Sequence, residues 1–393
     1  MTKWKAILQS SIRDAASLRE MLNLTDEEVN SIQAIAENYP MCVNSYYLGL
    51  IVPDDPNDPI RRMSIPDAAE FVSGGTADTS GEASNTVVRG MQHKYRQTAL
   101  ILSTNQCAMY CRHCFRKRMA GKENQDETAV DIYAMAEYVR THPEINNVLI
   151  SGGDAFLNSN DTIKKYLEVF SEIPSIHYIR FGTRTPVVLP QRITEDEELV
   201  RILHEYGTKT QIIIVTQFNH PRELTEDAKK AVRILHQNGC VIRNQTVLLK
   251  GVNDNEQVLA DLMNGLVAAG VIPYYLFQCR PASGVKNQFQ VPIRKAVDIV
   301  DEAKKHMSGQ AKGFRYAMSH PTGKIEILGN TGQGVLFKYH QAKHDDNHAR
   351  YIVKNLSPDD CWLDESEITT QKGIFYETEH IQLDSQRGCI CKS

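Results

Sequence analysis

Residues 98–118 read TALILSTNQCAMYCRHCFRKR and hold the two features that decide the fold. The run TALILST is short and apolar, which is typical of a buried strand. Directly behind it, Cys107, Cys111 and Cys114 fall within eight residues. We therefore expect the three cysteines to lie together on one loop at the end of a strand.

The same rhythm continues along the chain. Five further apolar runs, each separated from the next by a stretch with helical spacing, read NVLISGG, HYIRFGT, KTQIIIVTQ, CVIRNQTVLL and VIPYYLFQC. Alternating strands and helices predict a parallel sheet buried on both faces, and right-handed crossovers curl it toward a barrel. The predicted class is α/β, a partial (β/α)6 barrel with an N-terminal helical region and a C-terminal extension.

The 393 residues are enough for two or three structural units. Thr25 and Glu28 have the spacing of a capping box, which marks one helix start. Residues 53–63, PDDPNDPIRRM, and the polar stretch from Gly74 predict irregular connector rather than core. We expect three parts: a helical region with connector at 1–95, the barrel at 96–307, and a C-terminal segment with tail at 308–393.

The amino-acid composition limits the kinds of partner that the protein is expected to bind. The chain has 44 Lys+Arg against 48 Asp+Glu, so a basic nucleic-acid footprint is absent. No apolar run approaches the roughly 18 residues of a membrane span, and the start lacks a signal-peptide pattern, so we expect a cytoplasmic protein with no membrane partner. Nine cysteines in a reducing compartment favour metal ligands or reactive thiols over disulfides.

The number of clustered cysteines is informative. A structural zinc site closes with four protein ligands, whereas a cubane held by three cysteines leaves one iron open. The C-x3-C-x2-C spacing, with His113 before the last cysteine, resembles the signature of the radical S-adenosylmethionine (SAM) superfamily. The resemblance implies a 4Fe-4S cluster on these cysteines and cleavage of SAM to a 5'-deoxyadenosyl radical. A zinc knuckle recruiting Cys240 or Cys279 is the alternative.

Later strand runs also end in polar residues. Gly152, Gly153 and Asp154 follow the second run and match the superfamily's GGD-type element, which contacts the SAM amino group; a plain turn is the alternative. Arg184 and Gln245 follow or end later runs and are candidates for the SAM carboxylate and nucleoside. A structural polar role is equally open for these two.

Beyond the sixth strand run, Lys324 follows Pro321 and Gly323. From about Trp4 to this lysine, the chain resembles the lysine 2,3-aminomutase family. The matching segments include SYYLGLIVPDDPNDPIRR, CAMYCRHCFRKRMAGK, LISGGDAFL, GTRTPVVLPQRIT, FNHPRELT and RNQTVLLKGVND. The resemblance implies pyridoxal 5'-phosphate (PLP) on Lys324, although the family's turn is longer and richer in glycine. It also implies PLP contacts at Tyr95 and its neighbours Lys94 and Arg96.

The resemblance further implies conversion of an α-amino acid to its β-isomer. The radical takes hydrogen from C3, PLP supplies the π bond through which nitrogen migrates, and the protein positions and shields. Arg116 matches the family's arginine for the substrate α-carboxylate, a task that suits a guanidinium fork. We expect a free amino acid, a small molecule, as substrate and an external electron donor.

Two positions depart from the lysine-acting pattern. Those members hold the substrate ε-ammonium with two aspartates, where this chain has Arg280 and Ser319. An ammonium roughly 4 Å from Arg280 would be repelled by about 4 kcal/mol at an effective dielectric of about 20. Lysine is therefore a poor candidate, and glutamate or aspartate is the leading expectation. In a second interpretation, Arg280 pairs with a protein acid or a cofactor phosphate and leaves a neutral pocket.

The tail departs as well. Lysine-acting members bind zinc through C-terminal cysteines and a partner's cysteine after GVND, whereas this chain has Cys389, Cys391 and, after GVND, Asn255. Zinc is therefore doubtful, and the family suggests a homo-oligomer. Two rival functions remain: a family member acting on free or protein-bound lysine, and a zinc-stabilised binding protein without enzymatic activity.

Overall fold

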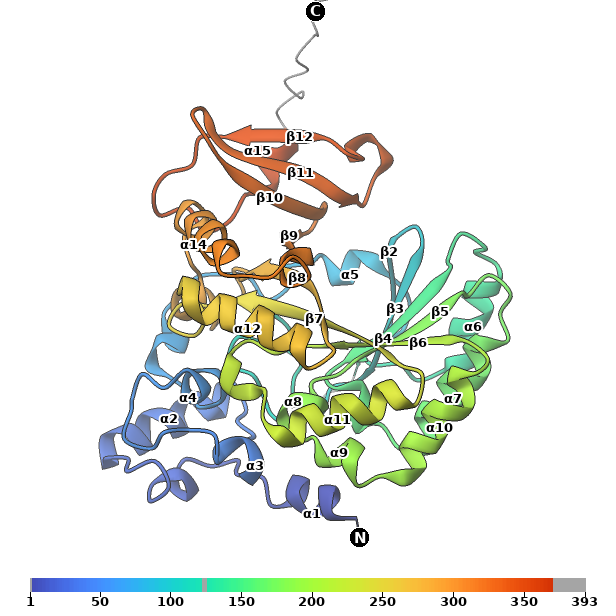
Figure 1. Ribbon diagram of the computed structural model, residues 1–393, viewed down its shortest axis with the longest axis horizontal. Coiled ribbons are helices and arrows are strands. Elements are labelled where there is room, and N and C mark those ends of the chain that lie inside the picture. Colours follow the sequence, from blue (N-terminus) through green and yellow to red (C-terminus); the bar gives the residue numbers. More distant parts are fainter. Residues whose placement is uncertain (1, 122–125, 370–393) are drawn as a thin grey trace, which may run out of the picture.

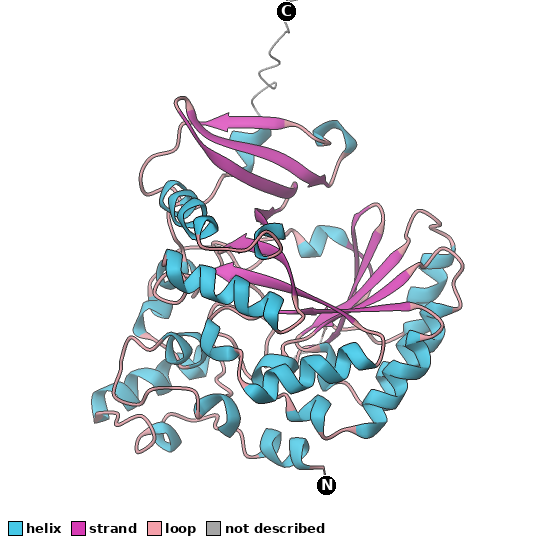
Figure 2. Cartoon of the chain, viewed as in Figure 1, coloured by secondary structure: helices cyan, strands magenta, loops and turns pink. Residues whose placement is uncertain are grey.

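The computed structural model describes residues 2–121 and 126–369 of the chain. Its strands form one mixed sheet in the order β1 to β12, with helices packed along its flank (Figures 1 and 2). The α/β class predicted from the sequence is confirmed. None of the described helices is long and apolar enough to cross a membrane.

The centre of the sheet is parallel, and neighbours in space are neighbours in sequence. Each of the six predicted runs forms one of its strands. They are β3 (Thr98–Thr104), β4 (Asn147–Gly152), β5 (Tyr178–Gly182), β6 (Gln211–Thr216), β7 (Val241–Leu248) and β8 (Ile272–Gln278). A seventh parallel strand, β9 (Arg315–His320), continues the series beside β8.

Helices connect these strands and cover the outer face of the sheet (Figure 2). They are α6 (Ile132–Arg140), α7 (Asn160–Ser171), α8 (Thr185–Val188), α9 (Gln191–Thr194), α10 (Glu197–Gly207), α11 (Glu226–Gln237), α12 (Glu256–Ala268), α13 (Lys286–Phe289) and α14 (Ile293–Lys305). Side chains alternate along each strand. In β5, Ile179 and Phe181 are fully buried, whereas Tyr178 and Arg180 line a cavity on the other face.

The N-terminal region forms α1 (Lys3–Gln9), α2 (Asp26–Asn38), α3 (Ser45–Leu48) and α4 (Pro59–Ser64), which lie below the sheet in Figure 1, and α5 (Glu82–Asn85), which lies beside β2. The predicted capping box is confirmed at the start of α2. Thr25 Oγ1 accepts from the Glu28 amide at 3.2 Å, and the Glu28 carboxylate accepts from the Thr25 amide at 2.9 Å. Single-turn 3-10 helices are η1 (Ala16–Leu18), η2 (Ala68–Phe71), η3 (Ala155–Leu157), η4 (Pro221–Glu223), η5 (Ala311–Gly313) and η6 (Asp345–Asn347).

The expectation of irregular connector at 53–63 was wrong for its second half. The Asp58 carboxylate accepts from the amides of Ile60 and Arg61 at 2.8 Å each, and Pro59 occupies the first turn, where its missing N–H costs nothing. Ile60 and Met63 of the resulting helix are fully buried. This segment therefore contributes to the core.

The C-terminal strands are antiparallel and stand above the parallel sheet in Figure 1. They are β10 (Gly323–Thr331), β11 (Gly334–Ala342) and β12 (Tyr351–Lys354), followed by α15 (Glu365–Thr369). At the opposite edge, β1 (Thr86–Val88) and β2 (Met91–Tyr95) pair antiparallel beside β3. Across the β9–β10 hairpin, Gly323 faces His320 and Lys324 faces Ser319, which confirms the tight turn predicted before the lysine.

Candidate active site

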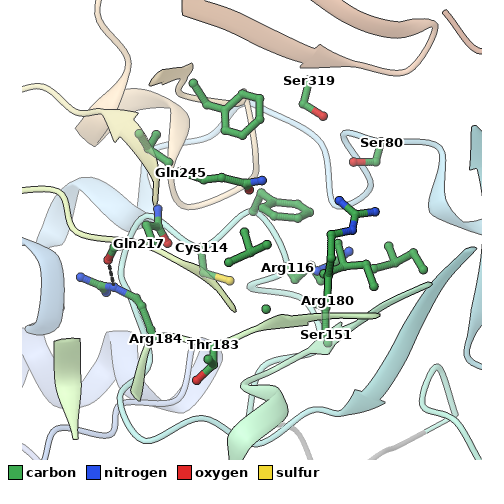
Figure 3. A pocket seen from close by; sticks show the side chains of 18 of the residues that line it. Ser80, Cys114, Arg116, Ser151, Arg180, Thr183, Arg184, Gln217, Gln245 and Ser319 are labelled. Atoms are coloured by element: carbon green, nitrogen blue, oxygen red, sulfur yellow. Dashed lines mark hydrogen bonds between the residues drawn. The ribbon is translucent and has the colours of Figure 1, made fainter. Parts of the chain in front are cut away.

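A cavity of about 610 Å³ lies on the inner face of the parallel strands. Apart from Arg96, the residues that the sequence nominated for the cluster, the cofactors or the substrate line it. These are Tyr95, Cys107, Cys111, Cys114, Arg116, Gly152, Gly153, Asp154, Arg184, Gln245, Arg280, Ser319 and Lys324. Figure 3 shows part of this set converging from several strands and loops.

The cysteine loop follows β3 and is held in place by the N-terminal region. Arg112 Nε donates to Glu70 Oε1 at 2.8 Å, and Lys117 Nζ lies 2.7 Å from Glu70 Oε2. The Arg112 amide donates to the Met63 carbonyl at 2.9 Å. Glu70 is fully engaged on one side of the loop, so the thiols are presented to the cavity on the other. No local sequence pattern identifies Glu70 as the partner of this loop.

The donor set fits an iron–sulfur cluster. Cys107, Cys111 and Cys114 are free thiols that face one cavity. In residues 2–121 and 126–369, no three His, Cys, Asp or Glu side chains are close enough to share a single metal ion. Sulfur ligands of a cubane bind different irons and need not meet at one point. Cys240 directly precedes β7 and so lies at the N-terminal ends of the parallel strands, whereas the cysteine loop follows the C-terminal end of β3. The zinc-knuckle alternative through Cys240 is therefore not formed.

Gly152 and Gly153 allow the C-terminal end of β4 to lie close to the cysteine loop. Gly152 has φ +108°, and a Cβ there would lie 2.3 Å from the Thr104 carbonyl oxygen. A Cβ on Gly153 would lie 2.3 Å from the Gln106 carbonyl oxygen. Any side chain would push β4 away from the start of the loop. The Asp154 carboxylate accepts from Thr183 Oγ1 at 2.6 Å, which ties the element to the end of β5.

Arg184 lies between the cysteine loop and the end of β6. Its guanidinium donates to Cys111 Sγ at 2.7 Å, to Glu223 Oε1 at 2.5 Å and to the Gln217 carbonyl at 2.9 Å (Figure 3). Tyr47 also donates to Glu223, at 2.7 Å. The carboxylate of Glu223 therefore fixes a cation beside the thiols, and the sequence did not nominate it.

Lys324 enters the cavity from β10. Its Nζ lies 3.4 Å from Gln341 Oε1 and about 5 Å from the ring centres of Tyr95 and Tyr275. Burial, with the positive charges of Arg180 and Arg280, lowers the pKa of Lys324 to about 7. A substantial fraction of this amine is neutral at physiological pH, as a nucleophile toward an aldehyde must be. The residues present therefore fit PLP.

Lys94 and Arg96, the two sequence neighbours of Tyr95, differ in whether they line the cavity. Lys94 lines the cavity, but its Nζ donates to the His320 carbonyl at 2.7 Å and to the Ser80 carbonyl at 3.4 Å. Arg96, which the resemblance also suggested as a PLP contact, is exposed and does not line the cavity. That suggestion was wrong for Arg96, because the chain turns outward between β2 and β3.

Arg116 is held by an acid that the sequence did not nominate. Its Nε and Nη2 lie 2.9 and 2.7 Å from Glu82 Oε1. Glu82 also accepts from Arg118 at 2.6 Å, and the two guanidiniums outweigh burial and lower the pKa of Glu82 to about 2. The carboxylate is therefore ionised, and one edge of Arg116 remains free toward the cavity.

Arg280 reaches the same end of the cavity. Its Nη2 donates to Ser319 Oγ at 2.7 Å, its Nη1 donates to Ser80 Oγ, and its guanidinium stacks 3.9 Å from the Phe115 ring centre. In the described part of the chain it forms no ion pair with a carboxylate; the acid with the largest effect on it, Glu82, already pairs with Arg116. The interpretation in which Arg280 pairs with a protein acid is therefore not supported.

Comparison with known proteins adds to this geometry. Residues 101–263 match the model of the radical SAM superfamily. The chain is 41% identical over 350 residues to a putative L-lysine 2,3-aminomutase of Aquifex aeolicus, covering 88% of this chain and 93% of the relative. It is 38% identical to the L-lysine 2,3-aminomutase of Clostridium subterminale, over 90% and 82% of the two chains. It is 35% identical to the glutamate 2,3-aminomutase of Clostridioides difficile, over 79% and 72%.

Proposed function

This chain belongs to the lysine 2,3-aminomutase family of the radical SAM superfamily, and we propose that it converts glutamate to its β-isomer. It is an aminomutase, an isomerase whose cofactors are a 4Fe-4S cluster, SAM and PLP. The observation that carries the choice of substrate is Arg280, a half-buried arginine without a carboxylate partner among the described residues, in one cavity with Arg116 and Lys324.

The charges at this end of the cavity favour a dicarboxylate. Glu82 is shared between Arg116 and Arg118, so Arg280 has no anion of its own in the part of the chain that the structure describes. A substrate carboxylate would supply that anion through charge-assisted hydrogen bonds, with Ser319 and Ser80 fixing the guanidinium. A lysine ammonium would be repelled there. One of the relatives is itself named a glutamate 2,3-aminomutase, which supports an acidic substrate.

Glutamate is favoured over aspartate by product chemistry. Moving nitrogen from C2 to C3 of glutamate gives 3-aminopentanedioate, a different compound. The same shift in aspartate regenerates aspartate, because its two central carbons carry equivalent carboxylate arms. A productive reaction on an acidic side chain therefore needs the longer substrate.

The chain's own residues bind, orient and shield. When bound, the cluster with SAM supplies a hydrogen-abstracting carbon radical and PLP supplies a π bond for nitrogen migration. Cys107, Cys111 and Cys114 would hold the cluster, and the amine of Lys324 would hold PLP. Arg116 would bind the substrate α-carboxylate and Arg280 the side-chain carboxylate. Gly152–Asp154, Arg184 and Gln245 would contact SAM, and Tyr95 would pack on the PLP ring.

The proposal extends to the architecture and setting. The six consecutive parallel strands β3 to β8 support a partial (β/α)6 barrel, within the division 1–95, 96–307 and 308–393. An external donor must reduce the cluster, and free thiols at its loop suit a cytoplasmic location. The homo-oligomer is a prediction from the family. Cys389 and Cys391, on which the doubt about zinc rests, lie outside the described residues.

The test is anaerobic incubation of the reconstituted protein with all common amino acids, SAM, PLP and a reductant. Mass spectrometry should detect 3-aminopentanedioate as the main β-amino acid. A product dominated by β-lysine would overturn the acidic assignment. Modification confined to lysines of an added protein would favour the protein-bound substrate instead.

A further inference from the structure

Arg180 is a second half-buried arginine with no acidic partner among the described residues. It lies on β5 and lines the cavity, and Figure 3 shows it across the cavity from Arg184. Its Nη2 donates to Asn147 Oδ1 at 2.6 Å and to Thr98 Oγ1 at 3.5 Å. Its Nε is buried and has no hydrogen-bond partner. No acid of the described chain is among the groups that act on its charge, which are three tyrosines and Arg243.

A buried cation in this state needs an anion. Burial lowers the pKa of Arg180, which reports the cost of keeping the charge away from water. Within the described chain, Asn147 and Thr98 both accept from Nη2, and Nε is enclosed by protein. The Arg180 side chain still lines the cavity in which the cofactors and substrate are expected. A guanidinium there suits carboxylate or phosphate oxygens.

The position of Lys324 narrows the identity of that anion. Arg180 is the charged group with the largest effect on the pKa of Lys324, ahead of Arg280. The aldehyde and the phosphomethyl group of PLP are substituents of adjacent ring carbons. A phosphate-binding group must therefore lie near the lysine that holds the aldehyde. The other cavity arginines already have proposed partners: Arg116 and Arg280 the substrate, and Arg184 the SAM carboxylate.

We infer that Arg180, oriented by Asn147 and Thr98, binds the phosphate of the PLP held by Lys324. The inference rests on the proposed function, since it takes PLP as the cofactor. Thr98 and Asn147 are paired at the starts of β3 and β4, and Asn147 is paired with Tyr178 at the start of β5. Arg180 would thus hold the phosphate near the N-terminal ends of these strands.

Arg243 offers a matched control. It is an arginine on β7, separated from β5 by β6, and it stacks 4.8 Å from the Tyr274 ring centre. Its Nε is also buried without a partner among the described residues. It does not line the cavity. A substitution there removes the same charge from the same sheet without touching the proposed phosphate site.

The experiment compares PLP with pyridoxal, which lacks the phosphate. Apoproteins of the wild type, R180Q, R180K and R243Q are titrated with each compound by absorbance, and borohydride-trapped adducts on Lys324 are counted by mass spectrometry. R180Q should weaken PLP binding about tenfold or more and change pyridoxal binding by less than about twofold. R180K should fall between, because it keeps the charge and loses the fork. R243Q should match the wild type.

Equal PLP affinity in R180Q and the wild type would overturn the inference, as would an equal loss of PLP and pyridoxal. If R180Q fails to fold by circular dichroism, the PLP-to-pyridoxal ratio of R180K decides in the same way. Failure of the proposed function is seen separately. A wild type that binds PLP through Arg180 but forms no 3-aminopentanedioate would refute the glutamate reaction and leave the phosphate site standing.

Discussion

Arg280 donates a hydrogen bond from Nη2 to Ser319 Oγ at 2.7 Å, and Ser319 is paired with Lys324 across the β9–β10 hairpin. The two positions that depart from the lysine-acting pattern are therefore in direct contact. One of them, Ser319, lies directly opposite the lysine proposed to hold PLP. A substrate whose amino group lies near Lys324 would have its side chain close to Arg280 and Ser319. The contact turns two separate sequence differences into one specificity element.

Replacing Arg280 should change substrate choice. R280Q removes one charge-assisted contact, worth about 1.5–3 kcal/mol, so the KM for glutamate should rise about tenfold to a hundredfold. S319A removes a neutral orienting contact and should have a smaller effect. Steady-state kinetics with glutamate and lysine measure both. The charge argument is wrong if R280Q keeps the wild-type KM for glutamate.

Lys324 should react as a neutral amine at an unusually low pH. Its pKa of about 7 predicts that acylation of apoprotein Lys324 becomes half-maximal near pH 7, measured by competitive isotope labelling and mass spectrometry. The exposed Lys312 serves as an internal reference. The unfolded chain keeps its proton up to the ordinary value of 10.5, so the free energy of unfolding should rise with pH between about 7 and 10.5. K324M should lose this part of the pH dependence; an unaltered profile would contradict it.

The sequence was sufficient for the parallel strands because strands buried on both faces read as continuous apolar runs. The cysteines and Lys324 were visible for a different reason, since their chemistry is rare and their spacing is local. Arg180 also has a local sequence signal, because it lies between Ile179 and Phe181 in a buried strand. A charged side chain is rare at such a position and indicates a functional role.

Other site residues had no local signal. Ser80 and Glu82 lie in a stretch predicted as connector, and their roles arise only when the chain path brings them beside Arg280 and Arg116. Tertiary contacts of this kind have no fixed sequence spacing. The error at 59–63 was of another sort, because Asp58 before Pro59 is a local helix start that three nearby prolines obscured.

Each of the three loop cysteines should be needed for the cluster. C107A, C111A and C114A should lose most of the bound iron and sulfide after anaerobic reconstitution, since a cubane with two protein thiolates is poorly held. C361A is the control, because Cys361 is a partly exposed free thiol that does not line the cavity. K324A should retain wild-type iron while losing the borohydride-trapped PLP adduct. Full iron in any one of the three loop variants would remove that cysteine from the ligand set.

Glu82 should act on the substrate through Arg116. E82Q keeps the shape of the side chain but removes the anion that both Arg116 and Arg118 share, so Arg116 loses its fixed orientation. The KM for glutamate should rise about tenfold, with a smaller change in kcat and with normal iron and PLP content. E127Q is the matched control, because Glu127 pairs with Arg118 and not with Arg116.

The pH profile separates this positioning role from a merely structural one. With its pKa held at about 2, the Glu82 carboxylate stays ionised at every pH at which the enzyme is assayed. The ratio of KM values for E82Q and the wild type should therefore be flat from about pH 6 to pH 9. E82D, which restores the charge on a shorter stem, should recover part of the loss. A ratio that changes tenfold across this range, or an E127Q variant with the same KM defect, would mean that Glu82 does not act by orienting Arg116.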